Sequence, residues 1–110
     1  MPTFSYSSIV PGDNACSITS TDSRLLISLS NELKAAFPMA TTQDNTLPSG
    51  EHFELTMHFH GLTPKDGAAQ AWFCFNTLLR YLCDRGWEPF AVHAEGEQTS
   101  TTVYHFRLLR

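Results

Sequence analysis

Hydrophobic and polar positions follow a helical period over residues 63–86, the longest such run in the chain. Apolar side chains recur there at steps of four and three, which places them on one stripe of a helix. The stripe consists of Ala68, Trp72, Phe75, Leu79 and Leu82, widened by Ala71 and Leu78. Thr63 before Pro64 is typical of a helix start, and Gly86 of a helix end. We therefore expect a helix here, with its apolar stripe in the core, to organise the rest of the chain.

A second helix is predicted from Thr21 or Asp22 to Phe37, where Pro38 prevents its continuation. Its apolar side comprises Leu26, Leu29, Leu33, Ala36 and Phe37, with Leu25 at the margin. Residues 38–50 contain two prolines, a glycine and many small polar residues, which predicts a long surface loop. Residues 3–20 fit a short hairpin, a single edge strand or, over residues 1–14, a flexible tail.

Three segments alternate with the period of two that half-buried strands show. Their inner faces are predicted to carry Phe53, Leu55, Met57 and Phe59 in residues 51–60, Phe90, Val92 and Ala94 in residues 88–95, and Tyr104, Phe106 and Leu108 in residues 101–109. A strand, a helix and two further strands predict a crossover closed by a hairpin. The expected fold is a single α+β domain over residues 1–110. It is a small two-layer sandwich with a three- to five-stranded, mostly antiparallel sheet and two helices on one face, ferredoxin-like or related.

The opposite face of this predicted sheet collects every histidine of the chain. We assign it as a binding face that consists of His52, Glu54, His58, His60, His93, His105 and Arg107. Side chains two apart on a strand lie within about 7 Å, so His58 and His60 could hold a metal ion, with Glu54, His93 or His105 as third ligand. Polar residues of an alternating strand face outward in any case, so a solvated or partner-facing surface is the simpler interpretation.

Charge and composition restrict the classes of partner. A formal net charge of −4 with only seven Lys and Arg argues against a nucleic-acid surface. The residues predicted to face outward also include no Phe, Tyr or Trp for base stacking. Three cysteines without a CxxC pair favour a reducing compartment, and no signal peptide or membrane-spanning run is present. We expect a cytoplasmic protein, with a nuclear location compatible, and neither nucleic-acid nor membrane partners.

Two classes of function follow from these observations. The first is a non-catalytic protein–protein interaction module, adaptor or regulatory, that uses the open sheet face, a sheet edge or the 38–50 loop. It is preferred because the sequence assembles no set of nucleophile, base and acid and no phosphate-binding loop, so we assign no catalytic residue and no cofactor. The alternative is a small ferredoxin-like enzyme or metal- or ligand-binding protein that uses the sheet-face histidines. A homodimer is compatible with either class.

Overall fold

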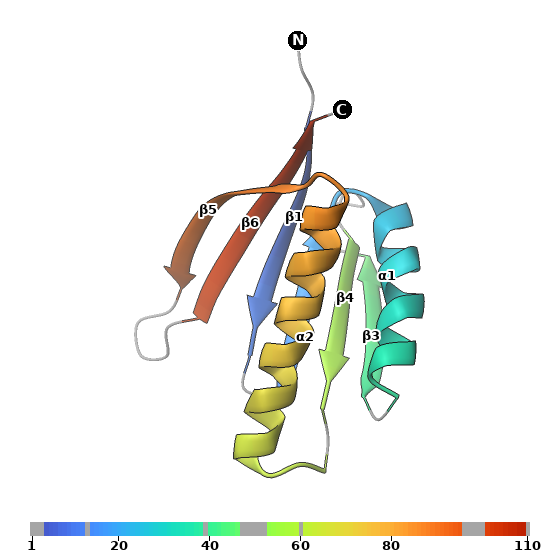
Figure 1. Ribbon diagram of the computed structural model, residues 1–110, viewed down its shortest axis with the longest axis vertical. Helices are drawn as coiled ribbons and strands as arrows, with labels where there is room; N and C mark the ends of the chain where they lie inside the picture. The colour runs from blue at the N-terminus through green and yellow to red at the C-terminus, as the bar shows by residue number, and fades with distance from the viewer. Residues whose placement is uncertain are drawn as a thin grey trace.

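The computed structural model describes residues 4–12, 14–38, 40–46, 53–59, 61–95 and 101–109. Its elements are, in chain order, β1 (Phe4–Pro11), β2 (Ala15–Ser20), α1 (Ser23–Ala36), β3 (Thr41–Thr46), β4 (Phe53–His58), α2 (Pro64–Asp84), β5 (Glu88–Glu95) and β6 (Thr101–Leu109). The strands form an antiparallel sheet in the order β3-β4-β2-β1-β6-β5, and both helices cover the same face of it (Figure 1). Neither helix, within the described residues, combines the length and apolar character needed to cross a membrane.

The α+β two-layer architecture is confirmed, but the predicted number of strands is wrong, since the described residues form six. The expectation of a flexible stretch over residues 1–14 fails for β1, which lies in the middle of the sheet between β2 and β6. Ile9 of β1 pairs with Ile18 of β2 and is fully buried. The predicted 38–50 loop contains β3, which pairs with β4 along its whole length. Its sequence TTQDNT has no apolar alternation, so backbone pairing rather than burial of side chains holds it.

Both helices begin and end where local signals predict. Asp22 caps α1 by accepting hydrogen bonds from the backbone N–H groups of Arg24 and Leu25 at 3.1 and 3.3 Å. Thr63 caps α2 in the same way, 3.2 Å from the N–H of Asp66. Gly86 follows α2 with a φ of 87°, a left-handed conformation that costs glycine little.

The buried side of α2 is rotated from the predicted stripe. Its buried side chains are Ala71, Cys74, Phe75, Leu78, Tyr81 and Leu82. Ala68 is exposed and Trp72 is 57% exposed, so their assignment to the core is wrong. At about 100° per residue, Trp72 lies roughly 120° around the helix from Leu78, outside the buried side. In α1 the predicted apolar side is confirmed except at Ala36, which is exposed.

The predicted inner faces of β4 and β6 are confirmed. Leu55, Met57 and Phe106 are each 1% exposed beneath the helices. In β5 the predicted inner face is not buried, since Val92 and Ala94 are exposed on the helix side. Phe90 leaves that side altogether, because a register shift between Pro89 and Ala91 makes it an extra residue. This β-bulge turns the Phe90 ring to the outer face, where it contacts Tyr6 and His105.

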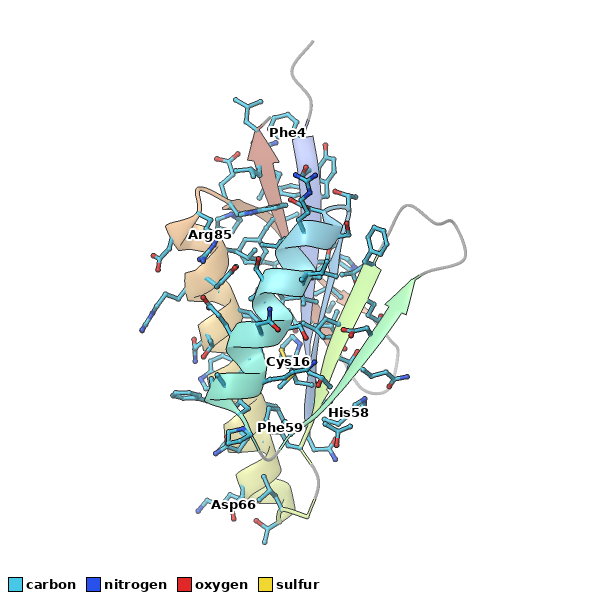
Figure 2. All side chains as sticks on the ribbon, turned by 90° about the vertical axis from the view of Figure 1, so that its right-hand side faces the viewer. Phe4, Cys16, His58, Phe59, Asp66 and Arg85 are labelled. Atoms are coloured by element: carbon cyan, nitrogen blue, oxygen red, sulfur yellow. The ribbon has the colours of Figure 1, made fainter. Side chains whose placement is uncertain are left out.

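Two buried cysteines meet in the core between sheet and helix. Cys16 of β2 is 1% exposed and Cys74 of α2 is fully buried, whereas Cys83 is exposed. Figure 2 shows Cys16 between the helices and the sheet. A side-chain hydrogen bond with Cys74, together with burial, raises the pKa of the Cys16 thiol. Cys16 and Cys74 therefore act as small core residues.

The arrangement of the strands leaves part of the sheet without helical cover. From β2 to β5 the elements follow the order β-α-β-β-α-β, and β1 and β6 add one strand at each end of that series. These two strands pair with each other and lie between β2 and β5. The helices pack on β1, β2 and β4, and the β5–β6 hairpin extends sideways beyond α2 (Figure 1).

Candidate functional site on the outer face of the sheet

The outer face, opposite the helices, carries a cluster of aromatic rings around one arginine. We call Phe4, Tyr6, Phe90 and Arg107 the aromatic patch. The Tyr6 ring centroid lies 6.2 Å from that of Phe4 and 6.0 Å from that of Phe90. Tyr6 and Phe90 remain 47% and 44% exposed, so the rings contact one another while offering much of their surface to a partner.

Arg107 holds this patch together from β6. Its guanidinium lies 5.1 Å from the Phe4 ring centroid and 5.3 Å from that of Phe90, both within cation–π range. Its Nε donates a 2.5 Å hydrogen bond to the carboxylate of Glu88. Strand register produces this arrangement, because Arg107 pairs with Tyr6 on one side and with Glu88 on the other. The salt bridge fixes the direction of the guanidinium between the rings.

A chain of polar side chains adjoins the aromatic patch. Ser8 Oγ lies 2.7 Å from His105 Nδ1, and His105 Nε2 lies 2.8 Å from His93 Nδ1. The two imidazoles stack with centroids 4.7 Å apart. Both contacts lie within hydrogen-bond distance, so the His105 ring joins a hydroxyl on β1 to a second imidazole on β5. Such a chain can pass a proton between its members, whereas a ligand would have to displace one of these hydrogen bonds to bind a His105 nitrogen.

The structure brings only some of the predicted site residues together. His93, His105 and Arg107 are close, whereas His58 lies on β4 and bonds Gln43 of β3 at 3.3 Å. Figure 2 places His58 on the sheet side away from the helices, as predicted. β2 and β1 lie between β4 and β6, so three strand spacings of about 4.8 Å put the two strands about 14 Å apart. The predicted ligand sets that join His58 to His93 or His105 are therefore wrong.

Of the remaining predicted residues, only Glu54 lies in the part of the chain that the structure describes, and the predicted pair of His58 and His60 is not tested. Glu54 is half-buried on β4, in register with Thr19, and lies as far from β6 as His58 does. His52 and His60 lie outside the described residues. Across the part of the chain that the structure describes, no three His, Cys, Asp or Glu side chains gather in a way that could hold a metal ion.

Sequence reasoning missed the aromatic members of this site. The stretch from Phe4 to Ile9 alternates, but either parity could face the core, and the inner side carries Ser5 and Ser7. The Ser7 hydroxyl donates a 2.9 Å hydrogen bond to the hydroxyl of Ser20 on β2, so this buried serine pair has its hydrogen bond within the protein. Phe4 and Tyr6 consequently face outward, and the statement that no aromatic ring faces out is wrong. The alternation predicts that Phe4 and Tyr6 share one face of the strand, but it does not tell which face is buried.

A separate apolar hollow lies on the helix side, where α1 ends and α2 begins. It has a volume of about 180 Å³ and is lined mainly by Phe37, Pro38, Phe59 and Leu62. The Phe73 ring of α2, 61% exposed, packs edge-on against Phe37 at 5.6 Å. The hollow lies across the sheet from the aromatic patch, and its lining offers few polar groups to orient a ligand.

This arrangement defines an α+β protein with two helices on one face of a six-stranded antiparallel sheet and an aromatic patch on the other. No protein-family model matches the chain, and no curated protein matches it either. A solved structure, that of a conserved kinetoplastid-specific protein from Trypanosoma cruzi, is similar with a TM-score of 0.55 and 14% sequence identity. The similarity covers 97% of this chain and 98% of that chain. At this identity it shows the fold alone.

Proposed function

We propose that the protein is a non-catalytic protein-interaction module, a cytoplasmic adaptor or regulatory domain, that binds a partner protein through the aromatic patch and the adjoining histidines. The observation that supports this most directly is the group of partly exposed rings, Phe4, Tyr6 and Phe90, around Arg107 on the sheet face opposite α1 and α2. Aromatic residues and arginine are the types enriched at the centres of protein interfaces.

The positions of the rings and the pairing of Arg107 both lower the free-energy cost of binding a partner at the patch. Its rings are already positioned against one another, so they lose little side-chain entropy when a partner binds them. Arg107 is neutralised by Glu88, which lowers the cost of covering its charge. The edge strand β5 adjoins the patch and offers backbone groups for strand addition. A homodimer through the same face is one form of this proposal.

Nucleic acid is the competing partner for an open sheet with exposed rings, because bases stack on such platforms. The outward rings favour it, while the net charge of −4 opposes it. Arg107, the basic residue at the centre of the patch, is paired with Glu88 and so provides little free positive charge for phosphates. We therefore propose a protein partner and make RNA an arm of the test.

The fold itself is compatible with several functions. We infer from the order of β2 to β5 that it is an elaborated ferredoxin-like fold, in which β1 and β6 are inserted between two strands of the simpler sheet. Small α+β folds of this type host binding and catalysis alike, so the assignment rests on the patch.

The test compares proteins retained from an extract of the native source by three immobilised forms. These are the wild type, the double variant Tyr6→Ser with Phe90→Ser, and the control Ile27→Ser, whose side chain is 64% exposed on α1. We expect a protein that the wild type and control retain and that the double variant loses at least tenfold. Unchanged retention by the double variant would refute the proposal. RNA retained at physiological salt, and lost by the same variant, would replace the protein partner.

The hydrogen-bonded chain from Ser8 through His105 to His93 supports a second candidate, a metal- or ligand-binding protein or small enzyme that uses these imidazoles. Titration with Zn²⁺, followed by NMR, compares the wild type with His93→Ala, His105→Ala and the control Ile27→Ala on α1. Stoichiometric binding that the first two variants lose and the control keeps would favour this candidate over the interaction module.

A further inference from the structure

The edge strand β3 is paired on one side only within the described residues. It pairs with β4 along its whole length and is the last strand of the sheet. In an antiparallel ladder about half of the backbone N–H and C=O groups point away from the partner strand, so those of β3 can pair with a further strand. Proline, lysine or a β-bulge commonly protects an edge. The other edge strand, β5, has Pro89 and a bulge, whereas β3, with the sequence TTQDNT, has none of these features.

A groove lies between this edge and α1. It has a volume of about 460 Å³, within the range of natural binding clefts. Its wall follows α1 from Ser23 to Lys34, about 16 Å at about 1.5 Å per residue, and its floor includes Asp44 of β3 and Phe53 of β4. The 6 residues of β3 span about 20 Å at about 3.4 Å each, so the strand edge and the groove have similar lengths.

The groove lies on the helix side of β3. Thr42 and Asp44 face this side, because their partners Met57 and Leu55 are each 1% exposed beneath the helices. In a strand added beside β3, alternate side chains would point to the same side and enter the groove. The free edge and the groove therefore form one site. We call it the edge groove and define it by the backbone of β3 and the side chains of Ile27, Lys34, Asp44 and Phe53.

The edge groove presents apolar and charged side chains in a fixed order. A short connection joins α1 to β3, so the two elements run side by side in opposite directions (Figure 1). Ile27, which is 64% exposed, and Phe53, which pairs with the last residue of β3, lie toward the end of that strand. Lys34 lies toward its start, and Asp44 lies between them. Both charged side chains are exposed, and neither has an ion-pair partner within the described residues.

We propose that the edge groove binds an extended segment of a partner protein, which adds to the sheet antiparallel to β3. Read from its N-terminus, the segment places an apolar residue beside Ile27, a Lys or Arg beside Asp44 and an acidic residue beside Lys34, at alternate positions. All strand pairs of the sheet are antiparallel, and this pairing is slightly more stable per residue than the parallel one. Backbone hydrogen bonds provide the affinity, and the alternate side chains provide the specificity.

Charge favours a foreign segment over a second copy of this protein. Residues directly opposite in an antiparallel pair share a face, so a two-fold pairing of β3 with itself over most of its length sets Asp44 opposite either Asp44 or Thr42 of the other copy. The two carboxylates then lie directly or diagonally across from each other, within about 8 Å, and repel. A segment with a cation at this position replaces that repulsion with attraction.

The experiment uses a capped peptide, Thr-Val-Thr-Lys-Thr-Glu-Thr, whose inward residues follow the proposed order. Its control, Thr-Val-Thr-Glu-Thr-Lys-Thr, has the same composition and net charge but exchanges the two charged positions. In an NMR titration we expect the first peptide to bind at least fivefold more tightly than the control. Hydrogen exchange should also show new protection at alternate amides of β3, which docking of side chains alone would not produce. Equal binding of both peptides, or no new protection in β3, would overturn the proposal.

A charge swap within the groove locates the binding. The double variant Asp44→Lys with Lys34→Glu keeps the net charge and should reverse the preference between the two peptides. The same swap on α2, Asp84→Lys with Lys65→Glu, changes two exposed residues outside the edge groove and should leave the preference as in the wild type. Asp44→Asn, a smaller change, should reduce the preference at least twofold.

Three results would contradict the location of this binding. The first is an unchanged preference in both groove variants, and the second is the same effect from the swap on α2. The third is a dimer, found by sedimentation, that the first peptide dissociates, because a second copy would then occupy the edge.

The edge groove is separate from the aromatic patch, so each of the two proposals can fail alone. The double variant Tyr6→Ser with Phe90→Ser alters the opposite face of the sheet and should bind the first peptide as the wild type does. Ile27→Ser, the control for the patch, should weaken that peptide and still retain the partner of the patch. Loss of the peptide in the double variant, with Ile27→Ser unaffected, would place the peptide on the patch and refute the edge groove.

Discussion

Truncation of two neighbouring aromatic residues on α2 tests the observed orientation of that helix. The sequence pattern treats Phe75 and Trp72 alike, as members of one buried stripe. In the structure Phe75 is 4% exposed and Trp72 is 57% exposed. Phe75→Ala should therefore destabilise the fold much more than Trp72→Ala, even though tryptophan is the larger side chain.

The expected magnitudes follow from burial. Phe75→Ala removes a buried ring and should cost about 3 to 5 kcal/mol. Trp72 buries somewhat under half of its surface of about 250 Å², or about 110 Å². Losing all of that burial would cost at most about 2.7 kcal/mol of folding free energy. Alanine keeps part of that contact and favours the helix by about 0.5 kcal/mol, so we expect Trp72→Ala to cost about 1 to 2 kcal/mol.

Urea unfolding at 25 °C, followed by circular dichroism, measures both costs. With an m-value of about 2 kcal/mol per molar, a gap of about 2 kcal/mol separates the two midpoints by about 1 M urea. Ile27→Ala, at an exposed position on α1, is the control and should stay near the wild type. Equal costs for Trp72→Ala and Phe75→Ala would refute the orientation of α2.

Three further predictions concern thiols and histidines. A thiol reagent should modify Cys83 rapidly and reach Cys16 and Cys74 only on unfolding, because those two are 1% and 0% exposed; fast reaction of all three would contradict their burial. Because the folded pKa of Cys16 is raised, its contribution to stability is complete below the unfolded thiol pKa of about 8.5 and declines above it by up to about 1.4 kcal/mol per pH unit. Urea titrations between pH 8 and 10 should show a shallower decline for Cys16→Ser, and identical slopes would count against the assignment. His105→Ala should cost about 1 to 2 kcal/mol in the same assay, since its ring makes two hydrogen bonds between strands, and His58→Ala about half a kcal/mol; the reverse order would argue against the histidine chain.

Local signals account for the parts of the fold that the sequence predicts well. The caps at Asp22 and Thr63 and the stop at Gly86 depend on contacts within a few residues, so they appear in the sequence itself. Along β4 and β6, large apolar residues of the inner face alternate with mostly polar residues of the outer face, and this predicts which face is buried. These features place two helices over one face and leave His105 on the other.

Non-local pairing decides the parts that the sequence does not predict. β3 has no apolar alternation, and its partner β4 supplies the hydrogen bonds that make it a strand. β1 alternates, but its inner face is set by the pairing of Ile9 with Ile18, which turns Tyr6 outward. The position of Phe90 depends on one extra residue opposite β6, which no spacing within β5 reveals. The aromatic part of the candidate site therefore depends on register, whereas its histidines do not.

The bulge at Phe90 explains why one hairpin carries apolar groups on both of its faces. Residues two apart in a regular strand share a face, so Phe90 and Val92 would point to the same side without it. With it, the Phe90 ring joins the aromatic patch and Val92 stays exposed on the helix side, in register with Tyr104. The β5–β6 hairpin thus carries an exposed apolar side chain on each of its faces.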